Sequence, residues 1–294
     1  MKTGPLSQCR QRTPVDELTL VSIIIPTLNA GRTLARTLVS ISNQTHSEVE
    51  VIVVDQGSND ATLSDASKAG ATIVRLKRRH THYSPPSHAR NIGAKIARGD
   101  FLFHLDADMQ MERSLLEKCV DACFKGRIDA ITIPEIDIGD GFWSKCKKFE
   151  RSLYFGDPSI EAPRFISTRA FQVVGGYDET ISSGEDWDLR IRLERMGFHI
   201  ARLEGSFVIH DLGRLALSSA VLKKYNYGKT FSMYVRKHRT ASISQALPLR
   251  SAYRRNFRLG NKDPTTIVGT AFMRTCEYLA ILFGMLVGAN FEAL

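Results

Sequence analysis

The stretch Asp-Phe-Leu-Phe-His-Leu-Asp-Ala-Asp-Met-Gln-Met, residues 100–111, decides the fold. Its apolar run, residues 101–105, follows Gly99, which is typical of a buried strand entered by a sharp turn. Asp106 and Asp108 come directly after that strand. Because the carboxyl ends of strands in an open α/β sheet face the crevice where ligands bind, we expect both acids to lie in a binding crevice.

Two explanations fit this pair of acids. Two carboxylates so close repel one another unless a cation lies between them, and their hard oxygen ligands suit Mg²⁺ or Mn²⁺ carrying a diphosphate. Alternatively, the pair caps a following helix whose first turn is residues 112–115, since acids favour helix N-termini. The rest of the chain has to decide between these explanations.

The chain before residue 100 alternates apolar runs with helical patterns. Strands are predicted at residues 20–26, 49–54 and 71–76, and helices at 33–42 and 62–69. The β-α-β-α-β order predicts a right-handed, doubly wound, mostly parallel sheet. Asp55 ends the second strand and should face the same crevice as Asp106. Neither Gly-x-Gly-x-x-Gly nor a Gly-x-x-x-x-Gly-Lys-Ser/Thr loop is present, which argues against a dinucleotide fold and a P-loop.

A second group of polar residues follows further along. After predicted elements at residues 114–125 (helix), 130–136 (strand), 142–154 (helix), 165–167 (strand) and 169–174 (helix), Gly184 precedes Glu185, Asp186 and Asp188. These acids complement the dipole of the helix that they begin, and a carboxylate at a helix start facing a crevice can also serve as a general base. His210 ends a later predicted strand.

The net charge of +9 is concentrated near the C-terminus, because residues 223–262 hold eleven Lys or Arg and no acid. Such a patch indicates an anionic partner surface. Residues 77–79 are also basic and either meet phosphates or form a solvated charge run. Five cysteines without a Cys-x-x-Cys pair indicate reduced thiols in the cytosol. Residues 1–19 read as a flexible tail, and no signal peptide is expected.

Residues 278–289 form a run of twelve uncharged, mostly apolar residues, with Arg274 and Glu277 just before it. Twelve residues are fewer than the ~20 that span a bilayer. The helix could therefore lie on or re-enter a membrane surface, pack in the core, or span. Gly284 and Gly288, four residues apart, indicate a close helix contact.

The motifs together resemble the family 2 inverting glycosyltransferases, which have the GT-A nucleotide-diphosphosugar transferase fold. In the family's order over residues 20–212, the matching pieces are Ser-Ile-Ile-Ile-Pro-Thr-Leu-Asn (22–29), Val-Val-Asp-Gln-Gly-Ser-Asn-Asp-Ala-Thr (53–62), Ala-Arg-Asn-Ile-Gly (89–93), Leu-Asp-Ala-Asp (105–108) and Gly-Glu-Asp-Trp-Asp-Leu (184–189). Five ordered motifs favour the metal explanation of the acid pair. The resemblance implies a catalytic domain at 20–212 and a helical, basic and apolar C-terminal region at 213–294.

The resemblance also implies roles for individual residues. Asp55 would bind the nucleotide base in a pocket lined by Pro26, Thr27 and Asn29, with Arg90 also on the donor side. Asp106 would face the ribose or diphosphate, while Asp108, aided by His210, would hold Mg²⁺ or Mn²⁺. Asp186 would act as the base, with Glu185 and Trp187 on the acceptor side.

We therefore expect a metal-dependent inverting glycosyltransferase that uses a UDP- or GDP-sugar. Gln56 stands where the family often has a second acid, so contacts to the base or ribose differ there. The Gln-x-x-Arg-Trp motif of processive members is absent, which favours transfer of one sugar. A lipid-linked or surface-glycan acceptor, an anionic membrane surface and a cytoplasmic, peripheral location are expected, and nucleic acid is not. The alternatives are a haloacid-dehalogenase-like phosphatase and a non-catalytic sugar-nucleotide binder.

Overall fold

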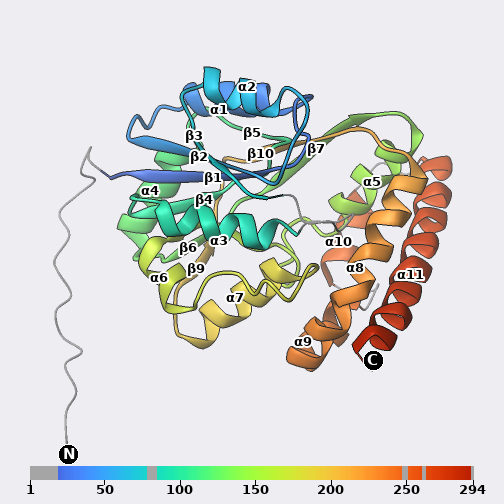
Figure 1. Cartoon of the computed structure of the whole chain (residues 1–294). Coiled ribbons are helices and arrows are strands. Elements are labelled where there is room, and N and C mark those ends of the chain that lie inside the picture. The colour runs from blue at the N-terminus through green and yellow to red at the C-terminus, as the bar shows by residue number, and fades with distance from the viewer. Residues whose placement is uncertain (1–18, 78–84, 247–250, 260–262, 293–294) are drawn as a thin grey trace, which may run out of the picture.

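The computed structural model describes residues 19–77, 85–246, 251–259 and 263–292. All but the last residue of the predicted tail, and His80 and His82, lie outside these ranges. A sheet with the order β3-β2-β1-β4-β8-β6-β9 forms the centre (Figure 1). Its strands are β1 (Val21–Thr27), β2 (Val49–Asp55), β3 (Thr72–Arg75), β4 (Phe101–His104), β6 (Ala130–Thr132), β8 (Pro163–Ser167) and β9 (Ile200–Arg202).

The four strands from β3 to β4 are parallel, as predicted. β8 runs antiparallel to both of its neighbours, β4 and β6. Side chains alternate along β1, so that Ile23 and Ile25 join the core under one group of helices and Ile24 joins the core on the other face. The predicted doubly wound, mostly parallel α/β fold is confirmed.

Helices cover both faces of this sheet. Buried residues of α1 (Leu34–Ser42), α2 (Thr62–Lys68) and α4 (Leu115–Gly126) pack on one face, and those of α3 (Pro86–Ile96), α6 (Thr168–Val173) and α7 (Glu185–Arg195) pack on the other. Leu189 and Leu193 are the buried apolar residues of α7, whereas Met196 follows the helix and is 60% exposed.

A second, smaller sheet was not predicted as such. It has the order β5-β10-β7, from β5 (Met109–Met111), β10 (Val208–Arg214) and β7 (Glu135–Asp140). The strand predicted at residues 130–136 is in fact two strands in different sheets, since the chain leaves the main sheet after β6 and enters the small sheet at β7. This small sheet pairs His210 of β10 with Met109 of β5, and so places the imidazole beside Asp108.

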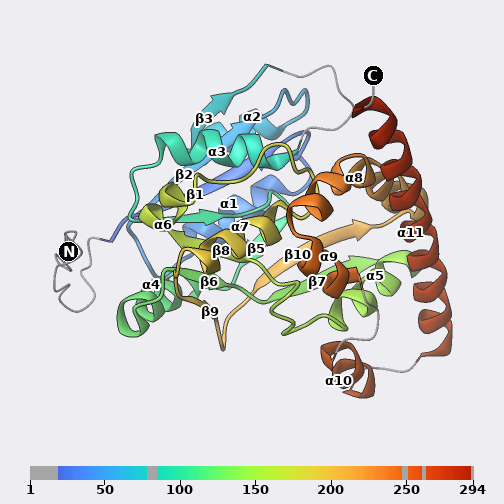
Figure 2. The same cartoon turned by 90° about the horizontal axis from the view of Figure 1, so that it is seen from below.

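The C-terminal region is helical, as predicted, with α8 (Leu217–Lys237), α9 (Arg239–Ala246), α10 (Ser251–Leu259) and α11 (Pro264–Glu292). α8 and α11 lie side by side, and α11 also packs on α5 (Phe142–Ser152) (Figures 1 and 2). The close helix contact predicted from Gly284 is confirmed, because a Cβ there would collide with the backbone of α8 at Tyr225 and Gly228.

α11 carries an apolar side that the described residues leave uncovered. Its exposed residues recur three or four positions apart, from Val268 (69% exposed) through Phe272 and Leu279 to Leu286 (64% exposed). The segment Pro264–Gly288 is long and apolar enough to cross a membrane by length and composition alone, and 22% of its most apolar window is buried. The core-helix alternative does not fit so exposed a segment.

Candidate active site

Arg90 lies at the centre of the site and joins acids from two distant motifs. It comes from α3 and is buried, with 3% of its surface exposed. Its Nη2 donates to Asp106 Oδ1 at 2.7 Å, while its Nη1 lies 3.3 Å from Asp186 Oδ1 and 3.4 Å from Glu185 Oε1. One guanidinium therefore contacts Asp106 and also Asp186, which lies 80 residues further along the sequence, together with its neighbour Glu185.

Asp106 is held on both of its oxygens. Arg164 Nη1 donates to Asp106 Oδ2 at 3.2 Å, opposite the contact with Arg90. Burial alone would raise the pKa of Asp106, but the two guanidinium groups outweigh burial and hold the pKa well below its usual range. Asp106 is therefore a fixed anion that orients two arginines, and its oxygens are not free for a metal.

The chain of alternating charges continues toward His210. Arg164 also binds Glu135 of β7 through Nε at 2.9 Å, and Arg151 of α5 pairs with Glu135 and with Asp137. Arginines hold the pKa of Glu135 at about 2 against the effect of burial, which would raise it. These paired groups, which we call the charged wall, connect the Asp186 side of the site with the Asp108 side through successive ion pairs.

His210 and Asp108 are brought together at the end of the second sheet. His210 Nε2 lies 3.4 Å from Asp108 Oδ2, and Nδ1 lies 3.0 Å from Asp137 Oδ1. Burial alone would lower the pKa of His210, but the hydrogen bonds to Asp108 and Asp137 raise it to about 9. The imidazolium is thus the form that this pair of acids favours.

The same arrangement fits a divalent cation. His210 Nδ1 lies 2.9 Å from Arg151 Nη1 and 3.0 Å from Asp137 Oδ1, so Nε2, which faces Asp108, is the nitrogen on which a metal would replace the proton. The Asp108 side chain is 42% exposed and offers free carboxylate oxygens. Within the described ranges no three His, Cys, Asp or Glu side chains form a metal cluster on their own. Two protein ligands suit Mg²⁺ or Mn²⁺, which take the remaining ligands from substrate phosphates and water.

α7 begins at Glu185, and Gly184 forms the turn just before it. Gly184 has φ +85°, a left-handed conformation that favours glycine, and a Cβ there would press on Trp187 and Tyr234. Asp186 has 34% of its side chain exposed, whereas Glu185 is 11% exposed and lies behind it. Burial, followed by the charge of Asp186, raises the pKa of Glu185 to about 8. Glu185 is therefore neutral at pH 7 and leaves Asp186 as the outward carboxylate.

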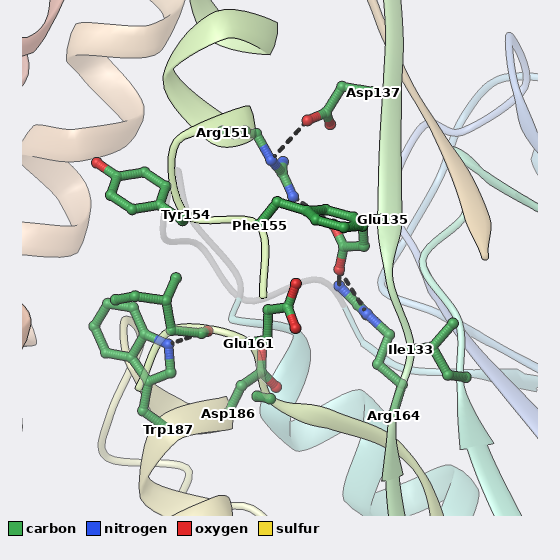
Figure 3. A pocket seen from close by; sticks show the side chains of 12 residues that line it. Ile133, Glu135, Asp137, Arg151, Tyr154, Phe155, Glu161, Arg164, Asp186 and Trp187 are labelled. Atoms are coloured by element: carbon green, nitrogen blue, oxygen red, sulfur yellow. Dashed lines mark hydrogen bonds and ion pairs between the residues drawn. The ribbon is translucent and has the colours of Figure 1, made fainter. Parts of the chain in front are cut away.

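Asp186 opens into a pocket of about 220 Å³ (Figure 3). Trp187 lies beside it, fixed by donation from Nε1 to the carbonyl oxygen of Ile160 at 2.8 Å. Arg151, Arg164 and Glu135 supply the charged wall. Apolar and aromatic side chains complete the lining, namely Ile133, Tyr154, Phe155, Ile160 and Ala162. Such a mixed lining suits a polar ligand that also has an apolar face, as a sugar ring does.

Where we expect the nucleotide to bind, the turn after β1 and the turn after β2 are joined by hydrogen bonds. Asp55 is buried and accepts from Thr27 Oγ1 at 3.2 Å and from the backbone N–H groups of Gly57 and Ser58. Asn29, at φ +52°, accepts from the backbone of Asn59 at 3.0 Å. Asp55 thus organises the turn after β2, and its direct contact with a base remains a prediction. Pro26 lies within β1, between these turns and the core.

The C-terminal helices hold the start of α7 in place. Asp188, fully buried one turn into α7, accepts from His238 Nε2 and from Lys237 Nζ at 2.7 Å each. Arg192 Nε donates to its other oxygen at 2.8 Å. Ser182 also donates its backbone N–H to Thr230 of α8. The region after residue 212 therefore contributes to the shape of the site.

Sequence reasoning missed four residues of the charged wall: Glu135, Asp137, Arg151 and Arg164. Arg164 belongs to β8 of the main sheet. The other three belong to β7 and α5, and only the small sheet brings them near His210. A clue was available in the alternation of Glu135 and Asp137, which places both on one face of a strand.

An α/β crevice that brings together a carboxylate at a helix start and an Asp-x-Asp turn is typical of transferases that use nucleotide sugars. The family described as glycosyl transferase family 2 matches residues 22–176, more than half of the chain. The chain therefore belongs to glycosyl transferase family 2. The predicted family is confirmed, and the phosphatase alternative finds no support.

Known relatives are longer than this chain. The pre-mycofactocin glycosyltransferase of Mycobacterium tuberculosis is 29% identical over 233 residues, which cover 74% of this chain and 48% of that protein. The chondroitin synthase of Escherichia coli is 28% identical over 202 residues, 65% of this chain and 29% of that protein. The chain thus spans less than half the length of these relatives.

Solved structures support the fold. A mannosyltransferase from Pyrobaculum calidifontis, solved with GDP-Man and Mn²⁺, superposes with a TM-score of 0.61 at 15% identity, over 97% of this chain and 91% of that one. TarS 1–349 of Staphylococcus aureus, solved with UDP, gives 0.55 at 16% identity, over 93% and 91%. The predicted GT-A fold class is confirmed.

Proposed function

We propose that this protein transfers one sugar from a nucleoside-diphosphate sugar to an acceptor hydroxyl, with inversion at the anomeric carbon. One observation carries the proposal: Asp186 faces the pocket and is joined through Arg90 to Asp106, next to the Asp108–His210 pair. This arrangement supports a base on the Asp186 side of the site and a diphosphate-binding group on the Asp108 side. A UDP- or GDP-sugar fits the names of the ligands bound by the structurally similar proteins.

Asp186 is proposed as the base. It takes the proton of the acceptor hydroxyl as that oxygen forms its bond to the anomeric carbon, while the bond from that carbon to the diphosphate oxygen breaks. Arg90 Nη1 lies 3.3 Å from Asp186 Oδ1 and holds the carboxylate at the pocket, where 34% of its side chain is exposed. A positioned base typically contributes about 10²- to 10⁴-fold to the rate. Attack opposite the leaving group produces inversion.

Asp108 and His210 are proposed to hold Mg²⁺ or Mn²⁺. When bound, such an ion neutralises charge on the departing diphosphate. Arg90 and Arg164 lie on the same side of the site and add fixed positive charge where negative charge develops. Thr27, Asn29 and Asp55 would shape the nucleotide subsite through their two interlocked turns, and Pro26 would support them.

We also propose that the domain at residues 20–212 acts with the helical region at 213–294 on a membrane surface, on its cytoplasmic side. The exposed apolar side of α11 and the exposed Arg254 and Arg255 of α10 support this proposal. Each basic residue near an anionic leaflet adds roughly 1 kcal/mol. In a flotation assay, the protein should float with vesicles rich in phosphatidylglycerol more than with neutral vesicles. The same amount of protein in the floated fraction with and without vesicles would contradict the membrane proposal.

The activity is tested by release of nucleoside diphosphate from a panel of UDP- and GDP-sugars, with Mg²⁺, Mn²⁺ or EDTA. The proposal expects release from at least one donor that depends on a divalent ion. It expects a β-linked product from an α-linked donor, seen by NMR. No release from any donor across the panel, with the protein folded, would contradict the proposed function.

A further inference from the structure

A second hollow opens on the far side of α5 from the charged wall. It also measures about 220 Å³ and lies between α5, α10 and α11. Its lining is largely apolar and aromatic, and includes Leu153, Tyr253, Phe257, Ile267 and Ala271. We call it the apolar hollow. The one guanidinium in its wall, that of Arg274, is held by Glu150 and Glu277 at 3.0 Å each, so this wall presents no unpaired charge.

The apolar hollow adjoins the pocket that contains Asp186. Tyr154, at the end of α5, lines both of them. In Figure 3 its ring stands between Trp187 and Arg151, with the hydroxyl turned away from Asp186. That hydroxyl donates to Glu150 Oε1 at 2.9 Å, which fixes the ring in this position. A ligand that fills both spaces therefore passes along one aromatic ring.

On its other side, the apolar hollow meets the uncovered side of α11. Ala271 and Tyr278 line the hollow, and Phe272 and Leu279, the next residues along the helix, are 55% and 51% exposed. Tyr154 on one side and Tyr278 on the other thus place the apolar hollow next to both the pocket of Asp186 and the exposed side of α11.

We infer that the apolar hollow binds the hydrocarbon chain of a lipid-linked saccharide, whose sugar hydroxyl reaches Asp186. This inference rests on the proposed function and names its acceptor class. A free glycan would gain nothing from an apolar space, whereas an alkyl chain buried there leaves water and gains affinity with each methylene group. The mixed lining around Trp187 then holds the saccharide, and the exposed side of α11 lies where the lipid leaves its membrane.

The test measures binding of methyl, hexyl and octyl β-glucoside by isothermal titration calorimetry, below the micelle concentration of each. Affinity should rise several-fold with each added methylene group. Ala271→Phe fills the hollow from an exposed position on the helix and should reduce octyl glucoside affinity at least about ten-fold. Thr275→Phe adds the same ring one turn along α11 and should leave the affinity within about two-fold.

Leu279→Lys distinguishes the hollow from the exposed side of α11. Octyl glucoside affinity should survive this change if the chain lies in the hollow. The inference is overturned if chain length has no effect, if Ala271→Phe binds as the native chain does, or if Leu279→Lys alone removes binding. These measurements need no donor. Release of nucleoside diphosphate, measured separately, therefore tests the proposed function independently of this inference.

Discussion

Arg90 Nη2 lies 2.7 Å from Asp106 Oδ1, and this ion pair links the helix that precedes the central strand with the turn that follows it. The same guanidinium reaches Asp186 at 3.3 Å. Burial of an arginine is tolerated here because the carboxylates of Asp106 and Asp186, with the carboxyl group of Glu185, surround it. The positions of the donor-side and acceptor-side acids relative to each other thus depend on one side chain.

Replacing Arg90 with Met should lower the free energy of unfolding by about 3 to 5 kcal/mol, because buried carboxylates lose their cation. Arg90→Lys keeps the charge but cannot reach all three acids, so we expect a folded protein with strongly reduced kcat. Urea denaturation and turnover measure the two effects. Arg98→Met is the matched control, since the Arg98 side chain is 78% exposed and its pair with Glu50 should contribute at most about 1 kcal/mol.

Glu185→Gln tests the neutral form of Glu185. The folded pKa of about 8 lies above the ordinary value of 4.5, so the folded state binds the extra proton between these values, and stability falls as pH rises through that window. The variant carries no titrating group there. Its stability relative to the native chain should therefore increase by a few kcal/mol, roughly, from pH 5 to pH 9. A difference in unfolding free energy that stays constant with pH would show that Glu185 has no raised pKa.

Asp188→Asn tests the contact between α7 and the C-terminal helices. The change leaves His238, Lys237 and Arg192 around a neutral amide, and we expect a loss of about 3 to 5 kcal/mol in unfolding free energy. Glu194→Gln, whose partner Arg190 lies on the same helix at the surface, should change stability by less than about 0.5 kcal/mol. Equal effects of the two changes on urea denaturation would argue against the contact.

Asp108→Asn tests the proposed metal site. Loss of a charged ligand should raise the Mn²⁺ concentration needed for half-maximal turnover at least about ten-fold. The control Asp121→Asn changes a surface acid paired with Lys125 and should leave that concentration unchanged. Full activity of the native chain in EDTA would show that Asp108 has another role.

Much of the fold followed from local patterns. The buried runs before Pro26, Asp55 and Asp106 are continuous and apolar, which is how parallel strands covered on both faces appear in a sequence. The small sheet could not be predicted, because β5 has three residues and β7 alternates polar with apolar residues, so neither forms an apolar run. Its pairing depends on contacts between segments about a hundred residues apart.

The candidate site was predictable to a similar extent. Asp106 and Asp186 stand near element ends, where periodicity marks them. His210 was predicted to end a strand, which is wrong, because β10 continues from Val208 to Arg214. Arg90 was noticed through its motif, but its contacts with both acid groups depend on the packing of α3 against the sheet. The neutral state of Glu185 arises from burial, which alternation of residue types does not reveal. The charged wall required the second sheet, which the sequence pattern did not show.

The central claim is that Asp186 removes the acceptor proton in a site assembled by Arg90. Asp186→Asn tests it most directly, with Glu185→Gln as the neighbouring control, by measuring donor affinity and single-turnover transfer. We predict that Asp186→Asn binds the donor with unchanged affinity and loses transfer by about 10²- to 10⁴-fold. Transfer by Asp186→Asn at the native rate would contradict the account.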